Sequence, residues 1–182
     1  MDNVQMSERE KSIVFIGFMG VGKTTIGSLV AEKLYRTFID IDEEIEKEYN
    51  MSINQIFAVH GEKTFREIEK RTVRSFCKQP LKVISLGGGA FMQPEIREIC
   101  LKNCIVFHLD MSWEHWKERL DLLIDSRPVL QGKDLNEIKE LFDKRKDAYT
   151  VNHSSVTVDS KTADEVADSI IDSLKLTWYL HK

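Results

Sequence analysis

The sequence has few of the residues that mark secreted, membrane-spanning or multidomain chains. Only three of its 182 residues are cysteine, and they form no Cys-x-x-Cys pair, which favours reduced thiols over a disulfide framework or a zinc site. Only three prolines occur, and no stretch is rich in glycine, serine or proline, so we expect no interdomain linker. No apolar run approaches the roughly 20 residues of a membrane helix. Because the first ten residues are also polar, we expect no secretory signal and a cytoplasmic location without a membrane partner.

Charge of neither sign dominates the chain. Lysine and arginine total 26 and aspartate and glutamate 30, so the net charge of −4 gives no reason to expect a nucleic-acid partner. Hydrophobic residues make up 42% and charged residues 31%, which is ordinary globular usage and argues against disorder. A chain of this length can bury about 70% of its surface. We therefore expect one domain over residues 1–182, acting as a monomer.

Short apolar runs alternate with helical patterns along the chain. The runs typical of strands lie at residues 12–16, 38–41, 83–86, 104–109 and 155–158. Between them apolar residues recur at helical spacing, and one such series is assigned to a single helix face: Trp113, Trp116, Leu120 and Leu123. The alternation predicts a three-layer α/β/α fold around a five-stranded parallel sheet. Ligands bind such sheets at the carboxyl ends of the strands, so functional residues are expected directly after each run.

The strongest motif follows the first apolar run. Residues 17–24 match the phosphate-loop pattern G-x-x-x-x-G-K-[ST] in full, between a predicted strand and a predicted helix. The glycines let backbone amides converge on phosphate oxygens, Lys23 adds positive charge near the β and γ phosphates, and the Thr24 hydroxyl can ligate Mg²⁺. The residues assigned to the nucleotide are Gly17, Gly20, Val21, Gly22, Lys23, Thr24 and Thr25. The motif alone does not separate GTPases, motors and small-molecule kinases, but the N-K-x-D motif of GTPases is missing from the sequence.

Two carboxylates follow the second apolar run. Asp40 and Asp42 are two residues apart, and in an extended strand such residues point to the same side. We therefore expect both to face the catalytic crevice, where one could hold Mg²⁺ and the other could accept a proton from an acceptor hydroxyl. The alternative is a strand end that runs into an acidic helix cap.

A glycine triplet and three scattered arginines complete the set of candidates. Gly87, Gly88 and Gly89 follow the third run, and close approach of backbone to a ligand would explain their conformational cost better than a flexible turn. Arg66 and Arg145 lie in predicted helices, and Arg127 precedes a proline where a mobile lid would fit. Taken singly, each arginine is more typical of a solvated surface than of a binding site.

Together and in order, these motifs resemble those of the shikimate kinase family, within the P-loop proteins similar to nucleoside monophosphate kinases. The resemblance covers about residues 11–175. It rests on the phosphate loop, Asp-x-Asp, Phe-Arg-x-x-Glu, the glycine triplet, Arg-Pro-x-Leu, and an arginine followed four residues later by tyrosine. It implies transfer of the γ-phosphate of ATP, the co-substrate, to the 3-hydroxyl of shikimate in aromatic amino-acid biosynthesis.

The resemblance also implies roles at the phosphates. Thr24 and Asp40 would hold Mg²⁺, and Lys23 would be a catalytic residue. Arg127 would swing in with a lid at about residues 121–133 to neutralise the transferred phosphoryl group and contact the nucleotide.

On the acceptor side, the resemblance implies a shikimate-binding helical region at about residues 43–75. Asp42 would bind the substrate hydroxyls and serve as the catalytic base. Arg66 and Arg145 would bind the carboxylate, and the pocket would be lined by Gly87, Gly88 and Gly89.

The sequence departs from the family pattern in places. Ile41 stands where a small polar residue is usual, residues 122–126 are more apolar than the usual basic lid, and Asp147 replaces a proline. Arg119 is a further candidate for contact with adenine. These departures concern the lid and the nucleotide more than the reaction class.

Two alternatives stay open from the residues alone. A kinase of the same fold with another hydroxylated carboxylate as acceptor, such as gluconate, would need similar arginines. A nucleotide-binding module that has lost its chemistry would have lost one of Lys23, Asp42 and Arg127, and all three are present.

Overall fold

The structure is a computed structural model that describes residues 6–123 and 128–180. Its centre is a five-stranded, all-parallel sheet in the order β2-β3-β1-β4-β5. The strands are β1 Ser12–Ile16, β2 Thr37–Asp40, β3 Lys82–Ser85, β4 Cys104–Asp110 and β5 Ser154–Thr157. Each lies within one residue, at either end, of an apolar run in the sequence, so the predicted sheet is confirmed.

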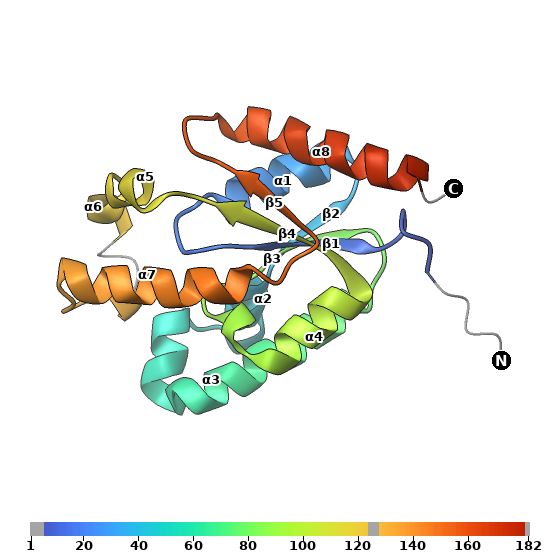
Figure 1. Cartoon of the computed structure of the whole chain (residues 1–182). Coiled ribbons are helices and arrows are strands. Elements are labelled where there is room, and N and C mark those ends of the chain that lie inside the picture. Colours follow the sequence, from blue (N-terminus) through green and yellow to red (C-terminus); the bar gives the residue numbers. More distant parts are fainter. Residues whose placement is uncertain (1–5, 124–127, 181–182) are drawn as a thin grey trace.

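Helices cover both faces of the sheet, which confirms the three-layer α/β/α architecture (Figure 1). On one face lie α1 Lys23–Lys33 and α8 Ala163–Leu180, and on the other α3 Ile53–Cys77, α4 Pro94–Asn103 and α7 Leu135–Tyr149. The shorter helices are α2 Ile41–Tyr49, α5 Trp113–Lys117 and α6 Leu120–Leu123, with 3-10 turns at Ala90–Met92 and Pro128–Leu130. Because both faces are covered, every residue of β1 is buried, and Ile13 pairs with Val83 of β3 and Ile105 of β4.

The single helix predicted from Trp113 to Leu123 is wrong. The chain forms α5 and α6 with a turn between them. Trp116 donates its indole N–H to the carbonyl oxygen of Met19 at 2.7 Å, and Arg119 donates to that of Gly20 at 2.8 Å. These two contacts place the turn against the phosphate loop, a tertiary interaction that helical spacing cannot reveal.

Capping boxes start the two helices that carry the arginines of interest. At α3, Ser52 accepts from the amide of Gln55 at 3.2 Å while Gln55 accepts from the amide of Ser52 at 2.8 Å. At α7, Asp134 and Glu137 make the same reciprocal pair, at 2.9 and 2.8 Å. Such boxes satisfy amides that a helix start leaves unpaired, so they fix where each helix begins.

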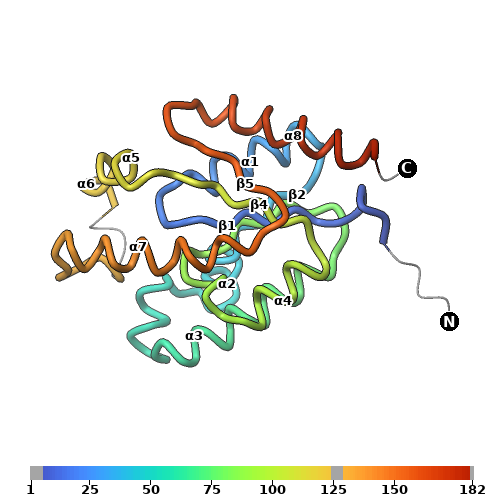
Figure 2. Tube along the Cα trace, viewed as in Figure 1, coloured from blue at the N-terminus to red at the C-terminus, as the bar shows by residue number. Residues whose placement is uncertain are grey.

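Helix α3 bends at Gly61, whose φ of 78° is left-handed. The bend matters because residues from both halves of the helix, including Phe57 and Arg66, line one cavity. Figure 2 shows the described ends of the chain near β1 and α8, at the opposite end of the sheet from α5 and α6. None of the described helices is long and apolar enough to cross a membrane.

Candidate active site

The phosphate loop joins β1 to α1 at the carboxyl edge of the sheet. Gly22 caps α1 with a left-handed φ of 103°, and a Cβ at Gly17 would lie 2.8 Å from the carbonyl oxygen of Leu109. Lys23 is only 8% exposed, and its ammonium donates to the carbonyl oxygens of Gly17 and Phe18 at 2.8 and 2.9 Å. Beside the loop lies a cavity of about 290 Å³, which we call the nucleotide cavity, lined by Gly20, Gly22, Lys23, Thr24, Thr25, Asp40, Asp42 and others.

A hydroxyl and a carboxylate meet at the start of α1. Thr24 Oγ1 donates to Asp40 Oδ2 at 2.9 Å, at the rim of the nucleotide cavity. Oxygen donors of these two kinds suit Mg²⁺, which is usually held by one or two protein oxygens together with substrate phosphates. Among residues 6–123 and 128–180, no cluster of three or more acidic, histidine or cysteine side chains could hold a metal ion by itself. The residues present therefore fit a nucleotide-bound Mg²⁺.

The expected strand geometry of the two aspartates is wrong. Strand β2 ends at Asp40, and Asp42 lies in the first turn of α2. The reason is that Asp40 Oδ1 accepts hydrogen bonds from the amides of Asp42 and Glu43, at 3.0 and 3.3 Å, and so caps the helix. Both carboxylates nevertheless line the nucleotide cavity.

A second cavity of about 340 Å³, here called the acceptor cavity, adjoins the first. Asp42, Gly87 and Gly88 line both cavities, so they lie at the border between them. A Cβ at Gly87 would lie 2.9 Å from Asp42 Oδ1. The glycine therefore gives the carboxylate room at this border.

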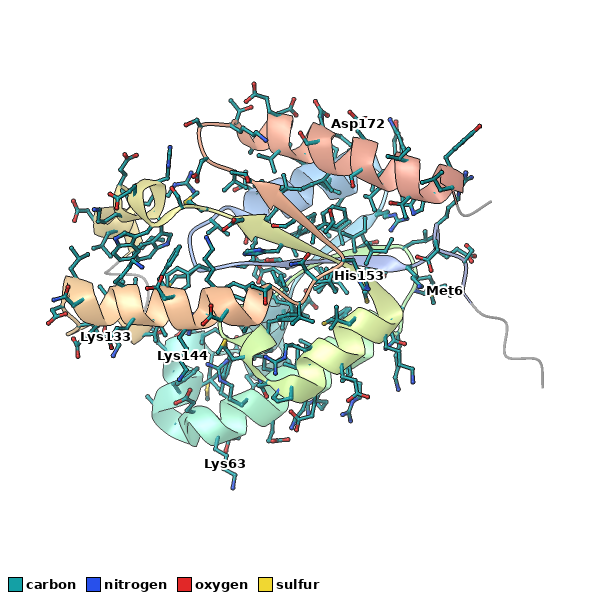
Figure 3. All side chains as sticks on the ribbon, viewed as in Figure 1. Met6, Lys63, Lys133, Lys144, His153 and Asp172 are labelled. Carbon is teal, nitrogen blue, oxygen red and sulfur yellow. The ribbon has the colours of Figure 1, made fainter. Side chains whose placement is uncertain are left out.

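Arg66 enters the acceptor cavity from α3 and is held by a buried carboxylate. Its Nη1 donates to Glu69 Oε2 at 2.7 Å, and Gln93 donates to the same oxygen at 2.8 Å. Glu69 is 1% exposed, and burial raises its pKa from 4.5 to about 7 although Arg66 opposes the shift. On the same helix, Lys63 extends away from the protein (Figure 3).

Arg145 enters the same cavity from α7 and is held differently. It is 7% exposed, and its guanidinium carbon lies 5.5 Å from the ring centre of Phe18. Among the described residues, no carboxylate lies within ion-pair distance of it. Burial lowers the pKa of Arg145, but an arginine remains charged at neutral pH. A buried cation that makes no ion pair within the described part of the chain calls for an anionic ligand.

The two guanidinium groups converge on Gly89. A Cβ there would lie 2.9 Å from Arg66 Nη2 and 3.3 Å from Arg145 Nη2. Any side chain would therefore displace the arginines, which explains a glycine at this position. The structure brings together Asp42, Arg66, Arg145 and the glycine triplet, four segments that are far apart in the sequence.

Two residues that contribute to the site are assigned no role there by the sequence alone. Glu69 belongs to the Phe-Arg-x-x-Glu motif, but only its burial against Arg66 shows what it does. Gln93, just before α4, carried no sequence signal. Arg119 lies between the nucleotide cavity and a further cavity of about 160 Å³. Arg127 lies outside the described residues.

Comparison with known proteins places this arrangement in a family. The family model described as shikimate kinase matches residues 19–175. The chain is 59% identical over 174 residues to a shikimate kinase of Oceanobacillus iheyensis, covering 96% of this chain and 95% of that one. It is 55% identical over 175 residues to that of Bacillus subtilis, covering 96% and 94%.

Comparison with solved structures points to the same family. A shikimate kinase of Acinetobacter baumannii in complex with shikimate superimposes with a TM-score of 0.87 at 31% identity, covering 93% of this chain and 96% of that one. A gluconokinase of Sinorhizobium meliloti gives 0.58 at 15% identity, covering 95% and 96%, which is a likeness of fold alone. On the sequence identity, the family model and the structural match, the chain belongs to the shikimate kinase family.

Proposed function

We propose that shikimate binds in the acceptor cavity with its carboxylate between Arg66 and Arg145. The observation that carries this proposal is the convergence of two guanidinium groups on Gly89, with Arg145 lacking a carboxylate partner among the described residues. Guanidinium groups recognise carboxylates through paired, charge-assisted hydrogen bonds. The carboxylate would replace the missing counter-ion.

Asp42 would then lie near the hydroxyls of the acceptor. It lines both cavities, so a group that it binds stands between the acceptor ring and the phosphates. As a carboxylate it can accept a hydrogen bond from a hydroxyl and take its proton as the phosphoryl group is transferred. This position supports Asp42 as the base for the 3-hydroxyl.

At the phosphates, residues 17–25 would bind ATP through backbone amides, and the Lys23 ammonium would move from the loop carbonyls to the β and γ phosphates. Thr24 and Asp40 would hold Mg²⁺, which when bound neutralises phosphate charge. Removing Mg²⁺ with a chelator should therefore abolish turnover, and adding excess Mg²⁺ should restore it.

The remaining parts of the proposal rest on the sequence resemblance. Residues 1–182 would form one domain, with residues 43–75 on the shikimate side and residues 121–133 as a lid. Arg127 would bring positive charge to the transferred phosphoryl group and to the nucleotide. The monomeric state and cytoplasmic location are likewise predictions from the sequence.

A coupled assay that follows ADP tests acceptor choice directly. With ATP and Mg²⁺, we expect turnover with shikimate and little or none with gluconate. Comparable kcat/KM values for the two acceptors would contradict the assigned acceptor site. If the protein binds ATP and shikimate but phosphorylates neither acceptor, the result would support the alternative of a nucleotide-binding module that has lost its catalytic activity.

A further inference from the structure

Tyr149 contacts the glycine triplet but does not line the acceptor cavity. It ends α7, one helical turn after Arg145, and is 2% exposed. Its hydroxyl donates a short hydrogen bond to the carbonyl oxygen of Gly88. Its ring packs against His108 at a centroid distance of 5.3 Å and lines a small cavity with Phe18 and His108. The phenol thus contacts the triplet without lining the acceptor cavity.

This hydrogen bond sets the orientation of a neighbouring amide. The peptide between Gly88 and Gly89 is trans, so its C=O and N–H point in opposite directions. With the carbonyl directed at Tyr149, the N–H of Gly89 points away from Tyr149, and both glycines line the acceptor cavity. Within the described part of the chain, the amide of Gly89 has no hydrogen-bond acceptor.

The opposite orientation of the Gly88–Gly89 peptide would weaken the binding of an anion in the acceptor cavity. Glycine peptides rotate with little steric resistance, so the triplet alone does not fix which way this group points. A reversed peptide would direct the Gly88 carbonyl oxygen toward Arg66 and Arg145, the groups that converge on Gly89. That oxygen would compete with an anionic ligand for their N–H donors and would repel it.

We propose that Tyr149 is a positioning residue that makes the acceptor cavity selective for anions by holding the Gly88–Gly89 peptide with its N–H facing the ligand. The inference rests on the proposed binding of a carboxylate between Arg66 and Arg145. Tyr149 lines neither the acceptor cavity nor the nucleotide cavity, so it would act through the peptide. Burial raises the pKa of the Tyr149 phenol, so it remains a hydrogen-bond donor throughout the neutral range.

The test variant is Tyr149→Phe, which keeps the ring and removes one hydroxyl. A net hydrogen bond of about 1 kcal/mol corresponds to roughly a fivefold change, so we expect the Kd and KM for shikimate to rise about three- to tenfold. The KM for ATP should stay unchanged. Tyr49→Phe is the matched control, since Tyr49 packs on His60 at the end of α2 and lines neither cavity.

A merely structural role would lower the melting temperature of Tyr149→Phe while leaving the Kd for shikimate as in the wild type, and that result would overturn the proposal. A neutral acceptor, the carboxamide of shikimate, gives a second readout. Tyr149→Phe should reduce the preference for shikimate over the carboxamide, and an unchanged preference would contradict selectivity for anions.

A measurement on the wild type does not depend on the folding of the variant. In an amide ¹H–¹⁵N spectrum, the Gly89 resonance should move strongly when shikimate is added. No movement while calorimetry shows binding would overturn the inference and leave the proposed function intact. If calorimetry of the wild type shows no shikimate binding, the proposed function itself fails.

Discussion

The two adjoining cavities are built differently. The nucleotide cavity takes its largest contiguous contribution from the phosphate loop and the start of α1, residues 19–25, where the backbone turns and the lysine folds back on the loop. The acceptor cavity is assembled from α2, α3, the loop after β3 and α7, and its charged side chains depend on partners behind them. A phosphate loop that is continuous in the sequence can be recognised from its motif. A cavity assembled from separate elements can be recognised only when the fold is known.

The cavities also differ in how they hold positive charge. Lys23 has backbone carbonyl oxygens as acceptors, Arg66 has the carboxylate of Glu69, and Arg145 has the ring of Phe18. We therefore expect loss of each cation to produce a different defect.

Removing the ammonium at the phosphates should have the largest effect. Lys23→Ala should lower kcat by about a thousandfold or more, because positioning and charge neutralisation provide most of the catalysis in phosphoryl transfer. Lys33→Ala on the same helix is the control, since Lys33 pairs with Asp164 and Asp168 at the surface. Steady-state assays with saturating shikimate measure the difference. Near-normal kcat in folded Lys23→Ala would contradict the assignment of the phosphate loop.

Removing Arg145, for which the described residues provide no carboxylate partner, should act on one substrate only. Arg145→Ala should raise the KM for shikimate by roughly 10- to 150-fold, since a charged hydrogen bond contributes about 1.5–3 kcal/mol. The KM for ATP should change little. Lys144→Ala, an exposed neighbour labelled in Figure 3, should resemble the wild type. Equal increases in both KM values would show that Arg145 is structural.

Removing Arg66, which pairs with Glu69, should also lower the stability of the folded protein. Arg66→Ala leaves the buried carboxylate of Glu69 with only Gln93, and breaking a buried pair costs about 3–5 kcal/mol. At pH 8 we therefore expect Arg66→Ala to melt at a clearly lower temperature than Arg145→Ala. Because protonation relieves the unpaired charge, the deficit should shrink at pH 6. If the melting temperature of Arg66→Ala is lowered equally at pH 8 and at pH 6, the result would argue against an ionised Glu69.

The smallest expected effect is on the pH dependence of binding in the wild type. The pKa of Glu69 is about 7, so it gains a proton between pH 8 and pH 6. A neutral Glu69 no longer repels the substrate carboxylate or competes for Arg66, so the Kd for shikimate should fall as the pH falls. The change should be at most about tenfold, which corresponds to one unit of pKa shift. Glu69→Gln should flatten the profile, and an equally steep profile in that variant would refute the role of Glu69.

The sequence predicted the sheet, and a phosphate loop between its first strand and the following helix, for physical reasons. The central strands β1 and β4 are buried and therefore form continuous apolar runs, and the ends of the partly exposed edge strands β2 and β5 also lie within one residue of the predicted runs. The phosphate loop is contiguous, so its motif is visible without the fold. Asp42 was assigned to the site but to the wrong element, because the capping of α2 by Asp40 depends on the local turn.

The residues of the acceptor cavity were harder to predict from the sequence. Arg66 and Arg145 stand alone in the sequence, and only the family resemblance paired them before the structure placed both at Gly89. The burial of Glu69 and the contact of Gln93 with it are tertiary facts without a local pattern. The turn between α5 and α6 was missed for the same reason, because it follows from contacts with the phosphate loop.

Calorimetric titration of shikimate onto Lys23→Ala and Arg145→Ala, without nucleotide, tests most directly whether the two cavities are separate recognition units. Lys23→Ala should bind shikimate with nearly the wild-type Kd although it turns over almost none. Arg145→Ala should bind it at least about tenfold more weakly. The reverse pattern, with shikimate affinity lost in Lys23→Ala and kept in Arg145→Ala, would contradict the account.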